Sequence, residues 1–284
     1  MKLLKRINKS VQTKHMLSRA GKLIFLVLLL FAGNHRVQSQ DLEVGLAGGG
    51  CYYLGDLNPG KHFLNTQFAY GLVARYGIDT RWAVKLSATR GEIRGNASAG
   101  SFLPDRGLSF TSPVTDISGT VEFNFMPYFT GSHMNRISPY IYAGFSVFFF
   151  NPVSNGVSLR SIGTEGQNIG YQGRKPYSLT GLSIPFGLGA KISLAKRLSM
   201  QVYWEMHKTF TDYLDDVSTT YYLVGRNIDP KDQAGLLSDP SRNHVPGMQR
   251  GNPNNNDWYA FFGLSFTYKF NLLASKKCRD LHHY

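Results

Sequence analysis

The segment from Trp258 to Phe270 alternates between two kinds of residue. Its even positions are all apolar or aromatic, and from Gly263 onward its odd positions are small or polar. A period of two is that of a β-strand whose two faces meet different surroundings. A strand of a soluble protein usually has about 5–6 residues, whereas one that crosses a bilayer needs about 9–11 and carries aromatic side chains at both ends. We therefore predict that this segment is the closing strand of a membrane-spanning barrel.

Seven earlier segments show the same alternation. In each, bulky apolar residues at every second position are predicted to face outward, and Gly, Ser, Thr and charged residues between them to face inward. The predicted strands are 41–54, 67–78, 81–93, 116–128, 138–149, 179–194 and 197–210. Met206 is among the predicted outward residues, and Pro185 predicts a bulge or weak pairing because it has no N–H to donate.

The connections between these segments alternate in length. Long polar loops, such as 94–115 and 211–257, alternate with short turns such as 131–136. Outer-membrane barrels have an even number of strands, short periplasmic turns and long extracellular loops. A secreted soluble sandwich would need neither the one-sided loops nor the repeated outward apolar stripes. The predicted fold is therefore all-β: an eight-stranded antiparallel transmembrane β-barrel over residues 40–270, with long extracellular loops.

The N-terminus has the features of a secretory signal peptide. Basic residues precede an apolar run at 23–32, which is shorter than the roughly 20 residues of a spanning helix, and no acidic residue occurs before Asp41. We predict a signal peptide at 1–39, with translation starting at Met1 or Met16, and a periplasmic tail at 271–284.

Removal of this signal peptide changes what the composition implies. It leaves 23 of the 31 Lys and Arg residues against 18 acidic ones, so the net charge falls from +13 to +5. A nucleic-acid-binding function thereby loses most of its support. The mean hydropathy of −0.22 argues against a helical membrane protein. Cys51 and Cys278 are not expected to form a disulfide framework, since one lies in a predicted strand and the other in the tail.

Charged residues recur at predicted inward positions. They are Glu43, Arg75, Lys85, Glu122, Lys191, Glu205 and Lys269. The charges of three acids and four bases nearly cancel. In a narrow lumen these side chains must form ion pairs or remain hydrated, because burying an isolated charge costs too much free energy. Eight strands leave no wide channel, so we favour a plug of salt bridges over a gated pore.

Two other polar groups are candidates for chemistry. Glu205 and His207 share one strand face, which suits acid–base catalysis, but no serine nucleophile motif accompanies them and a lumen hydrogen-bond network is the simpler interpretation. Asp212, Asp215 and Asp216 begin the longest loop, and such oxygen ligands can bind calcium. They lack EF-hand spacing, and acidic clusters of this kind are more often solvated or paired with Arg. We predict no catalytic residue, no metal and no cofactor.

Several motifs together resemble one family. They are YYLGDLNP at 52–59, EFNF at 122–125, Pro139-Tyr140 with Gly144 and Asn151-Pro152, GTEGQ at 163–167, and FTDYLDDVS at 210–218. In this order and spacing they resemble the PorG-like outer-membrane barrel family of Bacteroidota, a domain of unknown function of the DUF6089 type, over nearly the whole mature chain.

The resemblance implies a non-enzymatic role beside the type IX protein secretion system. There the PorG protein associates with a periplasmic ring built from the lipoprotein PorK and from PorN. We therefore expect a PorK-like lipoprotein, a PorN-like protein and outer-membrane lipid as partners, and no nucleic acid. The expected location is the outer membrane of a Gram-negative bacterium, with both termini periplasmic. A small pore, or a paralogous barrel of unrelated role, stays open as an alternative.

Overall fold

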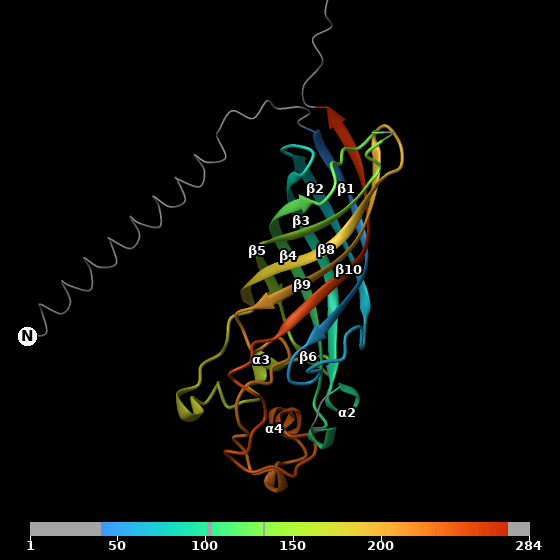
Figure 1. The fold of residues 1–284 in the computed structure, drawn as a ribbon. Coiled ribbons are helices and arrows are strands. Elements are labelled where there is room, and N and C mark those ends of the chain that lie inside the picture. Colours follow the sequence, from blue (N-terminus) through green and yellow to red (C-terminus); the bar gives the residue numbers. More distant parts are fainter. Residues whose placement is uncertain (1–40, 101–103, 133, 272–284) are drawn as a thin grey trace, which may run out of the picture. The chain divides into compact units, whose positions relative to one another are not determined.

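Eight long antiparallel strands make up most of the structure, a computed structural model that describes residues 41–100, 104–132 and 134–271 (Figure 1). They are β1 (Asp41–Leu54), β2 (Gln67–Gly77), β3 (Trp82–Asn96), β4 (Ser109–Asn124), β5 (Ile137–Phe150), β8 (Thr180–Ser193), β9 (Leu198–Thr209) and β10 (Trp258–Asn271). Each pairs with the next, and β10 pairs with β1 from Asp41↔Asn271 to Leu54↔Trp258. The sheet is closed, so the predicted eight-stranded antiparallel barrel is confirmed.

Short elements occupy the long loops at one end of this barrel. Among them, α2, α3 and α4 gather beyond the same strand ends in Figure 1. The short elements are α2 (Ala97–Gly100), η1 (Pro104–Arg106), β6 (Val153–Ser154), β7 (Val157–Ser158), α3 (Leu159–Ile162), η2 (Tyr171–Gly173), η3 (Gly225–Asn227) and α4 (Gln233–Ser238). No helix of the described part is long and apolar enough to cross a membrane. The predicted signal peptide and the predicted tail beyond Asn271 lie outside the described residues.

The outward face of the β3–β4 hairpin changes character along its length. On β4 the outward residues Ile117 and Val121 are apolar and exposed, whereas those nearer the loops, from Thr115 to Ser109, are polar except for Pro113. The inward face changes in the opposite sense, because Phe110 and Val114 are buried there. The hairpin therefore has apolar residues outside over one part and inside over the next.

This inversion explains why the predicted boundaries of β3 and β4 were wrong. Residues 94–115 were predicted as a polar loop, yet the two strands stay paired as far as Asn96↔Ser109. The outward polar side chains suggested a loop, while the inward Ile93 and Phe110 pack as they would in a soluble protein.

At its other end β4 stops at Asn124, short of the predicted residue 128, because the chain turns across the barrel mouth. Tyr128 is buried there, and the Thr130 hydroxyl donates a hydrogen bond to Glu43 inside the barrel. The Gly131 amide donates to Ser193 Oγ at 2.9 Å. The turn predicted at 131–136 is thus the second half of a longer segment that closes the short-turn end.

The loop between β1 and β2 covers part of the outer face near the long loops. The ring of Phe63 lies 5.0 Å from that of Tyr52 and 5.1 Å from that of Phe262. Trp204 Nε1 donates to Tyr52 Oη at 2.9 Å, and the same hydroxyl lies 3.7 Å from the sulfur of Met206. Met206 lies on the outer face as predicted but is buried, because Tyr52 lies against it.

Pro185 interrupts the ladder between β5 and β8, which is the predicted weak pairing. Pairs flank it at Ala143↔Phe186 and Ser146↔Ser183, and none forms between them. Equal numbers of residues are skipped on the two strands, so this is a gap in the ladder and not a bulge. Toward β9 the ladder continues, with Pro185 opposite His207.

Glycine permits the close approach of β1 and β10 at the closing seam. A Cβ on Gly49 would lie 1.9 Å from the carbonyl oxygen of Phe262, whereas a Cβ on Gly48 would meet nothing within 4 Å. We expect Gly49→Val to prevent closure, so that the folded band of unheated samples on a detergent gel is lost. Gly48→Val, the matched control, should fold normally, and equal folding of the two variants would contradict this role of Gly49.

Candidate functional site

The predicted inward charges form a buried ion network near the short-turn end. Arg75 Nη1 lies 2.8 Å from Glu43 Oε2, and Arg75 Nε lies 2.7 Å from Glu122 Oε2. Lys191 Nζ lies 2.6 Å from the same Glu122 oxygen. All four side chains are buried. Strands β1, β2, β4 and β8 each supply one of them, so the network ties together strands on different sides of the barrel.

The other three predicted charges lie apart from this network. Lys85 Nζ lies 3.0 Å from Glu205 Oε2 and 4.2 Å from the centre of the Tyr142 ring, which forms a second cluster. Lys269 pairs with Asp41 at 2.6 Å and donates to the carbonyl oxygen of Thr130 at 2.9 Å, at the barrel end. Asp41 was not among the predicted residues, because the first residue of a strand gives little signal about its partner.

Glu205 and His207 belong to a lumen hydrogen-bond network, as the sequence interpretation favoured, but its serine members were not predicted. Glu205 Oε1 lies 2.9 Å from His207 Nε2, and His207 Nδ1 lies 3.2 Å from Ser183 Oγ and 3.4 Å from Ser146 Oγ. Carboxylate, imidazole and hydroxyl in this order resemble a hydrolase triad. The two serines lie on β8 and β5 without any local motif, so only the strand pairing brings them to His207.

Access argues against catalysis by this chain of groups. His207 and both serines are buried. The ring of Tyr259 stacks on the imidazole at 4.4 Å, and that of Phe261 lies 5.4 Å from it. A cavity beside Lys85 and Glu205 has about 20 Å³, which is room for about one water molecule. The arrangement therefore serves as a structural hydrogen-bond relay across the lumen.

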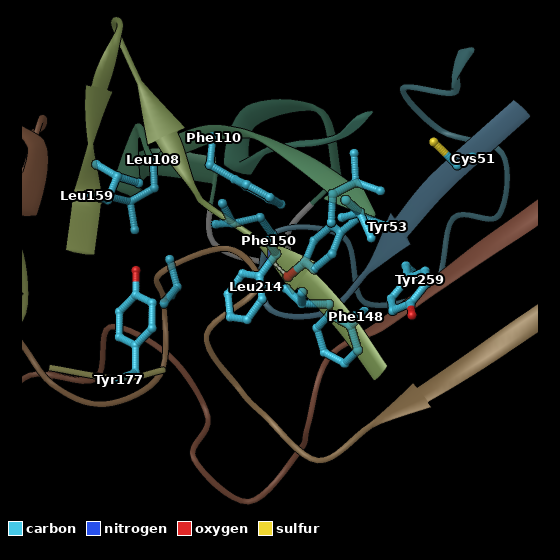
Figure 2. Packing of buried hydrophobic residues seen from close by; sticks show 14 of the residues in the cluster. Cys51, Tyr53, Leu108, Phe110, Phe148, Phe150, Leu159, Tyr177, Leu214 and Tyr259 are labelled. Atoms are coloured by element: carbon cyan, nitrogen blue, oxygen red, sulfur yellow. Dashed lines mark hydrogen bonds between the residues drawn. The ribbon is translucent and has the colours of Figure 1, made fainter. Parts of the chain in front are cut away.

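An apolar plug follows these polar layers toward the long loops. Strand residues such as Cys51, Phe148 and Tyr259 form one buried cluster with Leu214 and Tyr177 of the loops (Figure 2). Its members come from strand ends and loops alike, as in the core of a soluble domain. The sequence interpretation placed apolar strand residues mainly on the outer face and therefore did not predict this plug.

The three predicted loop aspartates lie beyond the plug, in a buried cluster that we call the acidic cap. Asp257 and Tyr53 join it from other segments. Tyr53 Oη donates to Asp215 Oδ2 at 2.5 Å and lies 3.2 Å from Asp257 Oδ1. A phenol has one hydrogen to donate, so the second contact is a hydrogen bond only if a carboxyl carries a proton. Tyr177 Oη donates to Asp216 Oδ1 at 2.8 Å.

Two buried arginines offset part of the charge of the acidic cap. Arg250 Nη1 lies 3.0 Å from Glu165 Oε1, and Arg250 Nη2 lies 3.7 Å from Asp216 Oδ2. Arg106 donates to the Asp56 carbonyl oxygen at 2.8 Å. The acids of the cap outnumber these two bases and are Asp56, Glu165, Asp212, Asp215, Asp216 and Asp257. Some of the acids must therefore be neutralised in another way.

The pKa values of these acids favour neutralisation by protons. Burial, followed by the charges of Asp215 and Asp56, raises the pKa of Asp212 to about 9; a nearby Ser218 offsets this only in part. Burial and Asp56 raise the pKa of Asp215 to about 8, and burial with Asp215 raises that of Asp257. Arg250 limits the rise for Asp216, whose pKa is about 6. In the described part of the chain no three His, Cys, Asp or Glu side chains are arranged to hold a metal ion.

Glu122 should be the most sensitive member of the ion network. Glu122→Gln leaves Arg75 and Lys191 without the carboxylate they share, and breaking a buried pair costs about 3–5 kcal/mol. We expect a large loss of unfolding free energy, measured by urea titration of the barrel in lipid vesicles. The matched control is Glu92→Gln, whose pair with Arg94 is exposed and stabilises by about 1 kcal/mol or less. Similar losses for both variants would refute the special position of Glu122.

The acidic cap should loosen as the pH rises. A carboxyl whose pKa is higher in the folded than in the unfolded protein stabilises the folded state. This stabilisation is complete below the pKa of the unfolded state, near 4, and is lost as the pH rises through the pKa of the folded state. Cap stability should therefore fall between about pH 4 and about pH 9.

Amide hydrogen exchange in residues 210–257, corrected for intrinsic rates, would measure this. Asp212→Asn should flatten the pH dependence, because the amide resembles the protonated acid, while Asp229→Asn in an exposed part of the same loop should leave it unchanged. Protection that rises with pH would contradict the assignment.

Comparison with solved structures finds distant likenesses to small barrels. Ail of Yersinia pestis is 12% identical, with a TM-score of 0.42 over 82% of this chain and 100% of that chain. Neisserial surface protein A is 10% identical, with a TM-score of 0.44 over 81% and 97%. OprG of Pseudomonas aeruginosa is 12% identical, with a TM-score of 0.38 over 82% and 97%. At that distance they assign no function to this chain, whose barrel is shown by its own strand pairing.

Comparison at the level of sequence gives one family. No curated protein matches the chain. The family described as "Domain of unknown function (DUF6089)" matches residues 22–223, from the N-terminal segment through β9 and into the loop that carries the acidic cap. This match spans more than half of the sequence, and the chain therefore belongs to the DUF6089 family of domains of unknown function.

Proposed function

We propose that this protein is a non-enzymatic outer-membrane barrel that acts as a structural component of the type IX protein secretion machinery. The observation that carries the proposal is the combination of an apolar outer belt with a filled lumen. The belt supports a place in a bilayer, and the filled lumen supports an anchoring role over transport through the barrel.

The outer belt has the dimensions of a membrane. On β5 every outward residue from Ile137 to Phe149 is apolar and exposed. This length rises about 40 Å along the strand, or about 30 Å along the axis of a barrel with the usual strand tilt, which equals the thickness of the hydrocarbon core. Aromatic side chains mark both edges of the belt: Trp82, Phe125, Tyr268 and Phe270 at the short turns, and Phe68, Tyr70, Phe149 and Phe210 toward the long loops.

The inversion on β3 and β4 supports the orientation. Apolar residues face outward where lipid would surround the hairpin and inward where water would surround it, at the end that carries the long loops. By the usual rule the long loops are extracellular and the short turns periplasmic. Both ends of the barrel chain, Asp41 and Asn271, lie at the short-turn end, since they pair with each other.

The lumen argues against a pore. Buried ion pairs, the relay around His207 and the apolar plug follow one another along the barrel, and the acidic cap lies over the plug. A conducting path would have to separate paired charges or expose the apolar plug to water. Both changes cost free energy.

The assignment to type IX secretion rests on the family resemblance, and the position of its motifs adds to it. The motif at 52–59 supplies Tyr53 and Asp56 to the acidic cap, the motif at 163–167 supplies Glu165, and the motif at 210–218 supplies the three aspartates. Segments far apart in the sequence thus meet in one place. The motif at 122–125 supplies Glu122, the shared acid of the ion network.

Planar bilayer recordings test the scaffold interpretation. The purified barrel should give no conductance steps in high salt under conditions in which a porin control does. Regular steps that require the folded barrel would overturn this part of the proposal and favour a small pore.

Deletion of the gene tests the secretion role. We expect type IX cargo to accumulate in the periplasm while outer-membrane integrity survives, and a tagged copy to restore secretion and cross-link to a PorK-like lipoprotein and a PorN-like protein. Gly48→Val should complement the deletion and Gly49→Val should not. Normal secretion in the deletion strain would point to a paralogous barrel of unrelated role.

A further inference from the structure

An apolar hollow interrupts the outer belt near the short turns of β3, β4 and β5. It has about 440 Å³ of open space. Its lining residues are Trp82, Val121, Phe123, Ile141, Tyr142 and Ala143. The hollow lies within the belt that faces lipid in the proposed function, on which this inference rests.

The hollow exists because a small residue lies among large ones. Ala143 faces outward on β5, directly opposite Val121 of β4. The next outward pair toward the short turns is Ile141 and Phe123. Phe123 lies in turn opposite Trp82, with ring centres 4.9 Å apart. The small methyl group of Ala143 therefore leaves a floor bounded by bulky apolar side chains, a shape that suits a flexible hydrocarbon chain.

An exposed cation is next in the chain to Trp82, one of the lining residues of the hollow. Arg81 directly precedes Trp82 and is exposed, and its Nη1 donates to the carbonyl oxygen of Phe125 at 2.9 Å. A guanidinium has five N–H donors, and this bond uses one. The nearest acid in sequence, Asp79, accepts bonds from the backbone amides of Arg81 and Trp82 at 2.6 and 2.7 Å. The carboxylate of Asp79 thus accepts hydrogen bonds from the backbone of the turn. The guanidinium of Arg81 can therefore donate two parallel hydrogen bonds to a phosphate.

We propose that this hollow is a binding site for one glycerophospholipid, with an acyl chain on Ala143 and the phosphate at Arg81. Two complementarities carry the inference. The hollow is lined mainly by apolar side chains and opens toward the lipid side, and the cation lies at the short turn, where headgroups of the periplasmic leaflet would be. A protein partner that reached this surface would have to enter the membrane, so a lipid is the occupant that the position favours.

Photolabelling in nanodiscs tests the site. The barrel would be reconstituted in phosphatidylethanolamine and phosphatidylglycerol that include a phosphatidylglycerol with a diazirine in one acyl chain. Illumination followed by peptide mass spectrometry gives the labelling along each strand. Labelling should concentrate around Val121, Ile141 and Ala143, which line the hollow, and exceed that of β2.

Two pairs of variants separate the hollow from the belt in general. Ala143→Phe fills the floor and should reduce its labelling to the level of β2, while Ala74→Phe adds the same ring on the outward face of β2 and should change nothing at the hollow. Arg81→Gln should reduce labelling by phosphatidylglycerol, whereas Arg197→Gln, at another short turn, should not. Ala143 and Ala74 lie on the outer face, and Arg81 and Arg197 are exposed turn residues, so folding on a detergent gel serves as the check that each barrel is intact.

The outcomes are distinct for the site and for the proposed function. Even labelling around the belt, or labelling unaffected by Ala143→Phe, would overturn the lipid site and leave the membrane placement intact. A folded barrel that takes no label on any strand would overturn both. Cross-linking of this hollow to a protein in native outer membranes, with lipid excluded, would also overturn it.

Discussion

The carboxylate of Glu122 is the interaction on which the inside of this barrel depends. It receives Arg75 from one neighbouring side of the lumen and Lys191 from the other, and Arg75 continues to Glu43. The four charges cancel, which is what a lumen too narrow for bulk water requires. One acid thus joins strands β2, β4 and β8, which are far apart in the sequence. The network holds together the layer of the barrel nearest the short turns without an apolar core.

Toward the long loops the barrel changes its construction. Phe148, Tyr259 and Leu214 fill the lumen as they would a soluble core, and the acidic cap then closes it with carboxyls that share protons and hydrogen bonds. A polar layer, an apolar layer and a second polar layer along one lumen give three different reasons for a solute not to pass. The motifs at 52–59, 163–167 and 210–218 converge on this second polar layer. The cap is therefore specified by the loop sequences, as the barrel is by the strand sequences.

The barrel could be predicted from the sequence because bulky apolar residues alternate with small or polar ones along most of its strands. Where this alternation runs the whole length of the strand, as on β10, the predicted and observed spans nearly coincide. On β3 and β4 the environment changes midway, and a search for outward apolar residues ends the strands too early although Phe110 and Val114 continue them on the inner face. The inward charges were predictable as a set, but their pairing was not, because Lys191 and Glu122 meet only through the register of the closed sheet.

The cap shows most clearly why the surroundings of a cluster cannot be predicted from the sequence. Three aspartates within five positions are compatible with a cation site, with solvation or with pairing to Arg, and their partners come from other segments. Tyr53, Tyr177 and the backbone amide of Val217 direct hydrogens at these carboxyls, and Arg250 supplies charge from a segment more than thirty residues away. Burial then favours the neutral acid over the ion. A buried acidic cluster with donors already in place is completed by protons, and its strength is thereby tied to the pH of the medium that the long loops face.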